Sequence, residues 1–450
     1  MSNSNIDKKI ITDQLLNAVK DQNLELISSL SNQFVAEELA ELLESTPPKE
    51  RSVLWSAIAA EIQGEILTHL NEEVRANLLG ELETHEIVEI TEELAVDDIV
   101  DIAQSLEQKE QIEFVESLGE ENREAVQMVL AFEENTAGGL MSTDFISVRA
   151  DITLGVVLRY LRQLGDLPPS TTALLVRDRD DHYVGSLQLR YLLTHDEDSE
   201  VHEFVDQAVP AINVYTSAKE VAHLFEKQDL IFAPVVDDQN RILGRITIDD
   251  VVDIIRDEAE HERMASAGLD EDEDIFSPPS RSAKRRTFWL GINLLTAIFA
   301  SIVIGLFDAS IEKVVALAVL MPIIASMGGI AGTQTATIVI RALATGKLGK
   351  SNSRSLLIKE STVGLYNGLI WAVLTGAAVM LWFQDWQLSA IFATAMLVNL
   401  LAAAFAGAMI PLILQRMRID PALASGLMLT TVTDSLGFFV FLGLATIVLL

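Results

Sequence analysis

The stretch that decides the fold is Gly426-Leu-Met-Leu-Thr-Thr-Val-Thr-Asp-Ser-Leu-Gly-Phe-Phe-Val-Phe-Leu-Gly-Leu444, an apolar run with one acidic residue, Asp434, near its middle. An apolar run of this length is typical of a membrane-spanning helix. A carboxylate at membrane depth is costly, so it usually lines a water-filled pathway or has a partner. We therefore predict that Asp434 lies on an ion pathway. The alternative is a structural carboxylate that is hydrogen-bonded to Thr430 or Thr431.

Four more apolar segments precede this one, at 288–307, 314–341, 358–383 and 387–415, and the last segment extends over 422–449. Each is long enough to cross a lipid bilayer as a helix. The sequence thus predicts a five-helix transmembrane pore domain over residues 287–450. Because a simple anchor would not need five spans, transport is the leading class of function.

Basic residues between these segments predict the orientation of the chain. They gather before the first span, in the loop after the second and before the fifth, whereas the other connections contain Lys313 as their only basic residue. We therefore expect the N-terminus in the cytosol, the C-terminus outside and the protein in the bacterial inner membrane. The N-terminal residues show no hydrophobic core of a signal peptide.

Charge divides the chain into two parts. Residues 1–280 hold 60 acidic and 20 basic residues, a net charge of −40, whereas residues 281–450 carry +6. Such an acidic chain is not expected to bind nucleic acid, which needs a basic surface. A soluble region rich in carboxylates suits a cation sensor. There is no cysteine and no acid–base or nucleophile constellation, so we do not expect an enzyme.

The soluble region shows two periodicities. Residues 1–135 follow the helical period, and Ala76–Leu82, Asp98–Leu106 and Glu124–Leu130 look like degenerate repeats of one short amphipathic helix. Short helices of this kind stack into a superhelix, because none can bury its apolar face alone. Residues 138–198 and 199–260 instead each read as a β-α-β-β-α unit, with strands such as Ala173–Asp178 and Ala233–Asp238. This doubled pattern resembles a tandem pair of cystathionine-β-synthase (CBS) domains.

An acidic segment over residues 256–280 follows, and it predicts a connecting helix and a linker that ends in Ser277-Pro-Pro-Ser280. Further on, the second apolar segment contains Met321-Pro-Ile-Ile-Ala-Ser-Met-Gly-Gly-Ile-Ala-Gly-Thr-Gln334. Its proline and paired glycines favour either non-helical backbone, with carbonyls free to face a hydrated cation, or a kink with close helix packing. The sequence leaves both open.

Met321–Gln334 resembles the P-x5-G-G-N-A-G-x-Q signature of the MgtE family of magnesium channels. Asp420–Gly426 and Thr430–Phe438 are similar to the last membrane helix of that family. In the soluble region, Thr136–Met141 also matches the family. The resemblance covers nearly the whole chain. It implies a multidomain membrane protein with an all-α superhelical N-domain, tandem α/β CBS domains, a long acidic plug-type connecting helix and a five-helix transmembrane domain.

The resemblance also implies roles for individual residues. It gives Asp434 the part of holding Mg2+ in the pore of a homodimer that forms through the pore and CBS domains. The accompanying pore motif comprises Pro322, Gly328, Gly329, Gly332, Gln334, Thr430 and Thr431. Regulatory metal ligands on the cytosolic side are expected at Asp97, Asp98, Asp101, Asp249, Asp250, Asp253, Asp257, Glu258 and Asp420.

Two departures from the family pattern bear on the ion. Ile330 stands where the family usually has Asn, and Leu427 stands where a Pro is common. An isoleucine offers no amide to an ion or its water. A chain of the same fold that transports Co2+ or another divalent cation is therefore one alternative, and a non-conducting membrane Mg2+ sensor is the other.

Two regulatory hypotheses follow. Carboxylates at domain junctions repel one another when cytosolic Mg2+ is scarce, and bridging Mg2+ favours a compact, closed form. In addition, Thr247 precedes Asp250 by three residues, and in CBS domains such a Thr-x-x-Asp binds the ribose of an adenine nucleotide such as ATP. The first CBS unit has Gln188 and Tyr191 at these places and lacks the motif.

Overall fold

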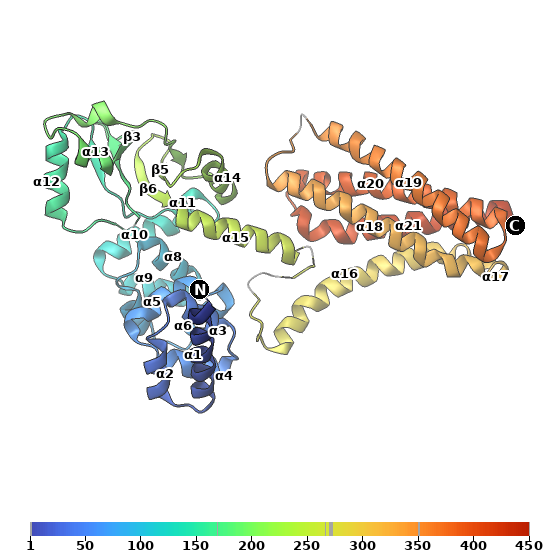
Figure 1. The fold of residues 1–450 in the computed structure, drawn as a ribbon, viewed down its shortest axis with the longest axis horizontal. Coiled ribbons are helices and arrows are strands. Elements are labelled where there is room, and N and C mark those ends of the chain that lie inside the picture. Colours follow the sequence, from blue (N-terminus) through green and yellow to red (C-terminus); the bar gives the residue numbers. More distant parts are fainter. Residues whose placement is uncertain (1, 169, 266, 270–272, 350–351, 450) are drawn as a thin grey trace. The chain divides into compact units, whose positions relative to one another are not determined.

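The computed structural model describes residues 2–168, 170–265, 267–269, 273–349 and 352–449. The chain forms two compact units (Figure 1). The first comprises residues 1–258 with 272–277, and the second comprises residues 259–271 with 278–450. Each unit is described by itself.

The first unit begins with a superhelix of short helices. Alternate helices pack on one another, as α3 does on α5, α5 on α7 and α8 on α10, so that each covers the apolar stripe of the next. In α8, for example, Ile99, Val100 and Ala103 are fully buried. The helices are α1 (Ser2–Lys20), α2 (Leu24–Ser31), α3 (Ala36–Glu44), α4 (Pro48–Ala57), α5 (Ala60–His69), α6 (Glu72–Leu79), α7 (Thr84–Thr91), α8 (Val96–Gln104), α9 (Gln108–Ser117) and α10 (Glu120–Leu130).

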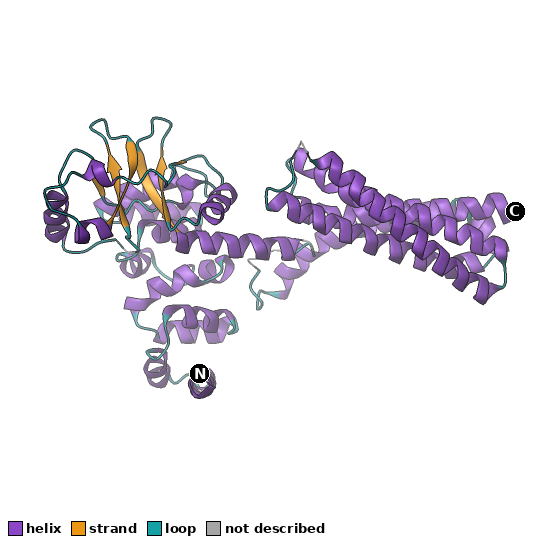
Figure 2. Cartoon of the chain, turned by 45° about the horizontal axis from the view of Figure 1, so that its top comes forward, coloured by secondary structure: helices purple, strands orange, loops and turns teal. Residues whose placement is uncertain are grey.

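Two three-stranded sheets follow, drawn in orange in Figure 2. In each, the middle strand is parallel to the first strand and antiparallel to the third. The first repeat consists of β1 (Ser147–Arg149), α12 (Leu154–Leu164), β2 (Ala173–Arg177), β3 (Tyr183–Gln188) and α13 (Leu189–Thr194). After the 3-10 helix η1 (Val201–Phe204), the second consists of β4 (Ile212–Asn213), α14 (Ala218–Gln228), β5 (Phe232–Val236), β6 (Ile242–Thr247) and α15 (Ile248–Ala265). The helical N-domain and the doubled α/β unit confirm this part of the expected fold.

The second repeat shares one hydrophobic core with the superhelix, whereas the first repeat has a core of its own. A short helix, α11 (Ala137–Leu140), makes this junction. The backbone N–H of Ala137 donates to the carbonyl of Thr216 at 2.7 Å, and that of Gly138 donates to Val214 at 2.8 Å. A Cβ on Gly138 would lie 2.6 Å from side-chain atoms of Phe132 and Val214, so only glycine fits there.

Residues 273–277, between α15 and the first membrane helix, are anchored on the superhelix. Arg51 Nη1 and Asp274 Oδ2 are 2.8 Å apart, and their side chains are 2% and 1% exposed. Arg51 Nε also donates to the carbonyl of Leu43 at 2.9 Å. Glu73 accepts from the backbone N–H of Asp274 at 3.2 Å and from the Ser277 hydroxyl. A buried ion pair with this many hydrogen bonds is costly to break from one side.

Within its described residues, the second unit contains five helices that are long and apolar enough to cross a membrane. The most buried of them, α20, packs against α18, α19 and α21, while α16 packs mainly on α21. Phe392 of α20 and Phe441 of α21 meet edge to face at 5.6 Å in the core. The five are α16 (Pro279–Gly305), α18 (Ala316–Ala344), α19 (Ser353–Phe383), α20 (Trp386–Arg416) and α21 (Pro421–Leu449), and the short α17 (Asp308–Lys313) follows α16. The five-helix part of the expected fold is thus confirmed.

Helix α18 runs without a break through Pro322 and both paired glycines. Of the two possibilities that the sequence left open for Met321–Gln334, non-helical backbone is therefore wrong, and close helix packing holds. Added Cβ atoms on Gly328 and Gly332 would lie 2.4 Å from Asn399 and 2.7 Å from Leu429, respectively. These glycines let neighbouring helices approach the backbone of α18.

Candidate functional site

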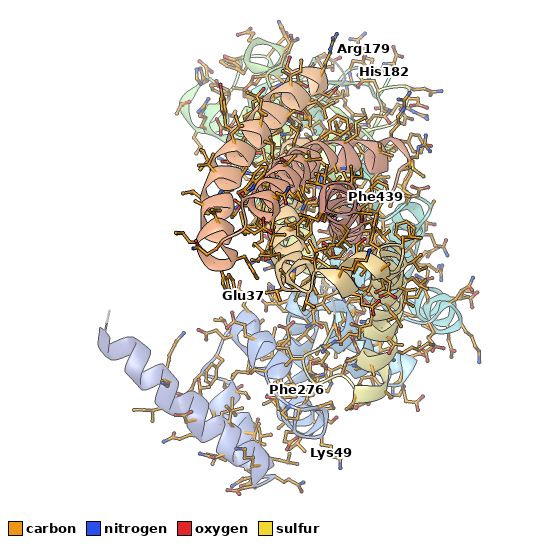
Figure 3. All side chains as sticks on the ribbon, turned by 90° about the vertical axis from the view of Figure 1, so that its right-hand side faces the viewer. Glu37, Lys49, Arg179, His182, Phe276 and Phe439 are labelled. Carbon is orange, nitrogen blue, oxygen red and sulfur yellow. The ribbon has the colours of Figure 1, made fainter. Side chains whose placement is uncertain are left out.

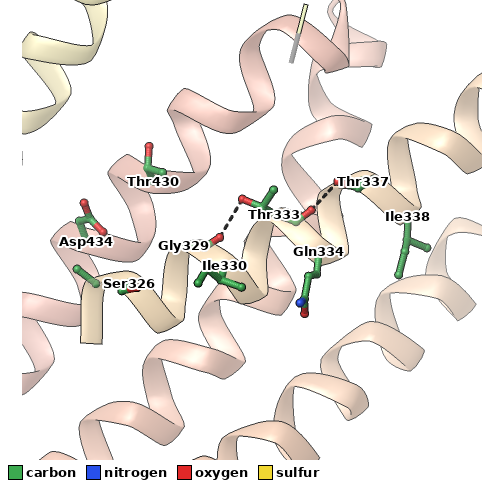
Figure 4. A pocket seen from close by; sticks show the side chains of 10 residues that line it. Ser326, Gly329, Ile330, Thr333, Gln334, Thr337, Ile338, Thr430 and Asp434 are labelled. Carbon is green, nitrogen blue, oxygen red and sulfur yellow. Dashed lines mark hydrogen bonds between the residues drawn. The ribbon is translucent and has the colours of Figure 1, made fainter. Parts of the chain in front are cut away.

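A groove of about 910 Å³ lies on the face that α18 and α21 share. From α18 it is lined by Ala325, Ser326, Gly329, Ile330, Thr333, Gln334, Thr337 and Ile338, and from α21 by Thr430 and Asp434 (Figure 4). These positions recur at helical spacing, so they form one stripe on each helix. The groove is open to solvent in the single chain and brings a carboxylate together with an amide and several hydroxyls.

Asp434 is half-buried and has no hydrogen-bond partner among the residues that the structure describes. The hydroxyl of Thr430 donates to the carbonyls of Gly426 and Leu427, both at 3.1 Å, and that of Thr431 donates to Leu427 at 2.8 Å. Neither hydroxyl donates to the carboxylate, so the alternative of a structural Asp434 held by these threonines is wrong. The carboxylate faces the groove (Figure 4).

The predicted pore motif divides into two groups. Gly329, Gln334 and Thr430 line the groove, whereas Pro322, Gly328, Gly332 and Thr431 do not. The sequence reasoning missed Ser326, Thr333 and Thr337, which lie on the same helical stripe as Gly329 and Ile330. Counting by three, four and seven from Ile330 would have found them. Ile330 is 57% exposed and adds an apolar side chain to the groove that Asp434 lines.

A second group of carboxylates gathers where α8 faces the start of α15. Burial raises the pKa of Asp98 to about 7, and the charges of Asp97, Asp101 and Asp250 add to the rise. Burial likewise raises the pKa of Asp101 to about 6 and that of Asp250 to about 6. The structure thus brings together four of the predicted regulatory residues, which we call the α8–α15 cluster: Asp97, Asp98, Asp101 and Asp250.

Two arginines partly offset this negative charge. Arg75 opposes the rise in pKa of Asp98 and Asp101, and its Nε donates to Ser105 Oγ at 2.8 Å. Arg245 is 7% exposed. Burial lowers the pKa of its guanidinium, and the charges of Asp97, Asp144 and Asp250 oppose this shift. Asp97 Oδ1 is buried without a hydrogen-bond partner within the described part of the chain. The cluster thus holds buried negative charge that the two arginines only partly offset, although no three of its carboxylates, all of which the structure describes, have ligand atoms within 4.8 Å of one another.

The other predicted regulatory residues have local partners. Asp249 accepts from Ser170 Oγ at 3.3 Å, and Glu258 pairs with Lys219. Arg256 lies 3.3 Å from Asp253 and 3.5 Å from Asp257. Asp420 belongs to the second unit, where it lies 2.9 Å from His261 Nε2 and accepts from the backbone N–H of Ala422 at 2.8 Å. Asp249 and Asp253 still border the α8–α15 cluster, because the charge of Asp249 raises the pKa of Asp250 and that of Asp253 raises the pKa of Asp101.

The pair proposed for a nucleotide occupies the turn from β6 into α15. Thr247 Oγ1 donates to Asp250 Oδ2 at 2.9 Å, so Asp250 is shared between this pair and the α8–α15 cluster. In the first repeat, Gln188 and Tyr191 occupy the same places at the turn from β3 into α13. Only the second repeat presents a hydroxyl beside a carboxylate there.

Among the described residues, one group of three has potential metal ligands within 4.8 Å of one another: Asp178, Asp180 and His182. Sequence reasoning passed over it, although the Asp-x-Asp-x-His spacing was visible. Asp178 Oδ1 accepts from the backbone N–H groups of Asp180 and His182 at 2.8 and 2.9 Å. His182 and its neighbour Arg179 lie at the surface (Figure 3), so hydrogen bonding within the turn accounts for the arrangement.

Comparisons with known proteins cover both units. Residues 321–444 match the MgtE family model, described as a divalent cation transporter. Residues 34–135 match the model of the MgtE intracellular N domain, and residues 137–198 and 201–257 match the CBS domain model.

Curated relatives and a solved structure extend this similarity. The magnesium transporter MgtE of Thermus thermophilus is 32% identical over 329 residues, which is 73% of each chain. The protein of the same name from Enterococcus faecalis is 28% identical over 326 residues, 72% of each chain. The crystal structure of the cytosolic domain of the Mg2+ channel MgtE in complex with ATP is 28% identical, with a TM-score of 0.50, and the match covers 54% of this chain and 99% of that one.

Proposed function

The chain belongs to the MgtE family of divalent cation transporters, and we propose that it carries Mg2+ into the cell through the groove that Asp434 lines. The observation that carries this proposal is a carboxylate that has no hydrogen-bond partner among the described residues and lines a groove between membrane-spanning helices. The family is one of transporters and not of enzymes, as expected from the sequence. No ATPase motif appears in the sequence, so the membrane potential would drive the ion inward.

The groove suits an ion that keeps its water. Mg2+ sheds water reluctantly and prefers six oxygen ligands. Six waters occupy roughly 180 Å³, at about 30 Å³ each. The groove, at about 910 Å³, has room for the hydrated ion, and the Asp434 carboxylate would contact its water shell.

A homodimer would complete this groove. Lipid cannot satisfy the polar groups of Gln334 and Asp434, so an open groove facing hydrocarbon is unfavourable. A second copy related by a two-fold axis would cover one groove with the other and place two Asp434 side chains around one pathway. We propose that the CBS domains add a second contact between the copies.

We infer the following organisation in the membrane. The domains comprise a helical N-domain (1–135), two CBS domains (138–198 and 199–260), the acidic connecting segment (256–280) and the pore domain (287–450). The basic residues that flank the spans support a cytosolic N-terminus, an outward C-terminus and the bacterial inner membrane.

We further propose that cytosolic Mg2+ closes the pathway. The α8–α15 cluster joins the superhelix to the helix that leads out of the second CBS repeat, so an ion bound there favours the compact arrangement. Each additional ion bound to the compact state adds to the shift, which makes the response steep. Asp249, Asp253, Asp257, Glu258 and Asp420 are proposed as further ligands that become available when their present partners exchange.

ATP is proposed to bind at the second CBS repeat through Thr247 and Asp250. Their side chains are hydrogen-bonded at 2.9 Å, and a ribose would compete for this contact. The first repeat lacks both groups. Isothermal titration of the purified chain with ATP tests this site, and absence of heat at millimolar ATP would remove it.

The second candidate is transport of another divalent cation, such as Co2+. The exposed Ile330 favours it, because an apolar side chain in the lining of the groove cannot hydrogen-bond to an ion's water. A non-conducting sensor is less well supported, because a sensor would not need a carboxylate in a groove of its membrane domain.

The deciding experiment is growth rescue at limiting Mg2+ in a bacterial host that lacks its own magnesium uptake systems. Wild type and Asp434→Ala are compared at equal expression. Rescue by wild type alone supports Mg2+ uptake through this carboxylate. Absence of rescue by well-expressed wild type points to another ion or to a sensor, and equal rescue by both overturns the role of Asp434.

A further inference from the structure

We propose that Asn399 is a positioning residue for the ion pathway, which sets the spacing of α18 and α21 beside Asp434 and so influences which divalent cation passes. The inference rests on the proposed transport function. No motif in the sequence pointed to Asn399, and it does not line the groove.

Asn399 is completely buried near the middle of α20, the most buried of the membrane helices. Its Nδ2 donates to the carbonyl of Ile324 in α18 at 2.9 Å. Its Oδ1 is also buried and has no hydrogen-bond partner within the described part of the chain. A buried amide that is only half satisfied is unfavourable in a membrane domain, which points to a role beyond packing.

The amide is inserted between the two helices that form the groove. A Cβ on Gly328 of α18 would lie 2.4 Å from Asn399 Nδ2, and a Cβ on Gly437 of α21 would lie 2.9 Å from the same atom. Both distances are shorter than real Cβ contacts. Each helix therefore has a glycine where it meets Asn399, and the amide fixes how closely each backbone approaches α20.

Both glycines lie close in sequence to residues that line the groove. Gly328 is followed by Gly329, and Gly437 lies one helical turn beyond Asp434. A displacement of the amide would therefore move both walls of the groove at the level of the carboxylate. Mg2+ demands near-ideal octahedral geometry, so a changed wall spacing alters its discrimination from other divalent cations. Substituting a group that orients metal ligands typically changes metal affinity 10–100-fold.

The test measures the ratio of Mg2+ to Co2+ uptake by the purified full chain in proteoliposomes. We expect Asn399→Leu, which keeps the approximate size and removes the hydrogen bond, to change this ratio about tenfold. The matched control is Ser389→Ala. Ser389 also lies on α20 and donates to a carbonyl of another helix, that of Gly376 in α19 at 2.6 Å, but this contact does not reach the groove walls. Its loss is expected to leave the ratio unchanged.

A second pair of variants covers the case in which Asn399→Leu does not fold. Gly437→Ala pushes a methyl against the Asn399 amide, whereas Gly443→Ala in the same helix meets nothing closer than 3.8 Å. Gly437→Ala is expected to change the uptake ratio in the manner of Asn399→Leu, and Gly443→Ala to leave it unchanged. An unchanged ratio in folded Asn399→Leu, or in Gly437→Ala where that variant must replace it, would overturn the proposal.

A measurement without transport separates this inference from the proposed function. The chain has no cysteine, so Ser326→Cys introduces a single thiol on the groove wall. Its reaction rate with a charged thiol reagent is expected to change several-fold when Asn399→Leu or Gly437→Ala is added, and not with Ser389→Ala. If the wild type takes up no divalent cation, the proposed function fails, and an unchanged thiol rate is then the result that overturns the positioning role.

Discussion

Asp434 and Asp98 are both acidic residues on helices, but they meet their surroundings in opposite ways. Asp434 stands apart from other carboxylates, in an open groove with room for a hydrated ion. Asp98 is packed among three other aspartates, where burial raises its pKa to about 7. A carboxylate in a groove can bind a passing ion without moving its helix. A buried cluster is stable only when its charge is neutralised, so an ion bound there holds two elements together. The first arrangement suits conduction, and the second suits regulation.

The largest effect that would test this contrast is expected for Asp434→Asn. The substitution keeps the shape and removes the charge, so we expect Mg2+ uptake into proteoliposomes to fall at least tenfold. Asp385→Asn is the matched control. Asp385 caps the first turn of α20 by accepting from Gln387 and Leu388, and asparagine caps a helix equally well. Similar losses in both variants would show that any acid near a membrane helix matters, and the contrast would fail.

A smaller effect of another kind is expected for the double variant Asp98→Asn, Asp250→Asn. Removing two charges weakens the preference of Mg2+ for the compact form, so about tenfold more Mg2+ should be needed on the cytosolic side to halve uptake. The maximal uptake should remain. Asp151→Asn serves as the control, because Asp151 pairs with Arg149 and Arg179 at the surface of the first repeat. Loss of maximal uptake in the double variant would place these aspartates on the pathway.

The pH dependence of the α8–α15 contact sharpens the same comparison. Because the pKa values of Asp98, Asp101 and Asp250 are raised on folding, the folded form binds more protons than the unfolded form between about pH 4 and 7. The contribution of these groups is therefore most favourable at low pH and is lost as pH rises through 6 to 7. Without divalent cations, hydrogen-exchange protection of α8, corrected for intrinsic rates, should fall over this interval.

Millimolar Mg2+ is expected to flatten this pH dependence, since the ion replaces the protons. The variant Asp98→Asn should flatten it without Mg2+. A protection profile that rises with pH, or one that Mg2+ leaves unchanged, would contradict the proposal that the cluster binds Mg2+.

The smallest effect concerns Asp250, which the ion cluster and the nucleotide pair share. Thr247→Val removes the hydroxyl that donates to Asp250 and keeps the shape of the side chain. A single hydrogen bond contributes about 1 kcal/mol, so we expect ATP affinity to fall a few-fold while uptake without ATP stays the same. Equal ATP affinity of the wild type and Thr247→Val, measured by calorimetry, would contradict the nucleotide role of this pair and would assign Asp250 to the ion cluster alone.

Sequence patterns predicted the elements well because each pattern has a simple physical cause. Apolar length predicted the five membrane helices, and the change of period near residue 138 predicted the passage from superhelix to sheets. The open choice at Met321–Gln334 has a cause too. Proline and paired glycines suit either a broken helix or close helix packing, and α18 keeps its helix through Pro322 and uses Gly328 and Gly332 to admit Asn399 and Leu429. Which glycine faces a neighbour and which faces a groove depends on tertiary packing.

The carboxylates show the same limit. Asp434 was predicted because a charge inside an apolar run is conspicuous. The proximity of Asp98 and Asp250 could not be predicted from local sequence. They are about 150 positions apart and come together only because the superhelix packs on the second repeat. No sequence pattern indicated a role for Asn399, because a single amide in an apolar helix does not by itself distinguish a functional residue from an incidental one.

The ion pair between Arg51 and Asp274 limits the distance between the superhelix and the start of the first membrane helix. Helix α16 begins at Pro279, five residues after the carboxylate that Arg51 holds. Five residues of fully extended chain span at most about 18 Å. While the ion pair is intact, the N-terminus of α16 cannot lie farther than this from Asp274. A swing of the superhelix beyond that reach must either pull on the membrane helix or break the Arg51–Asp274 pair.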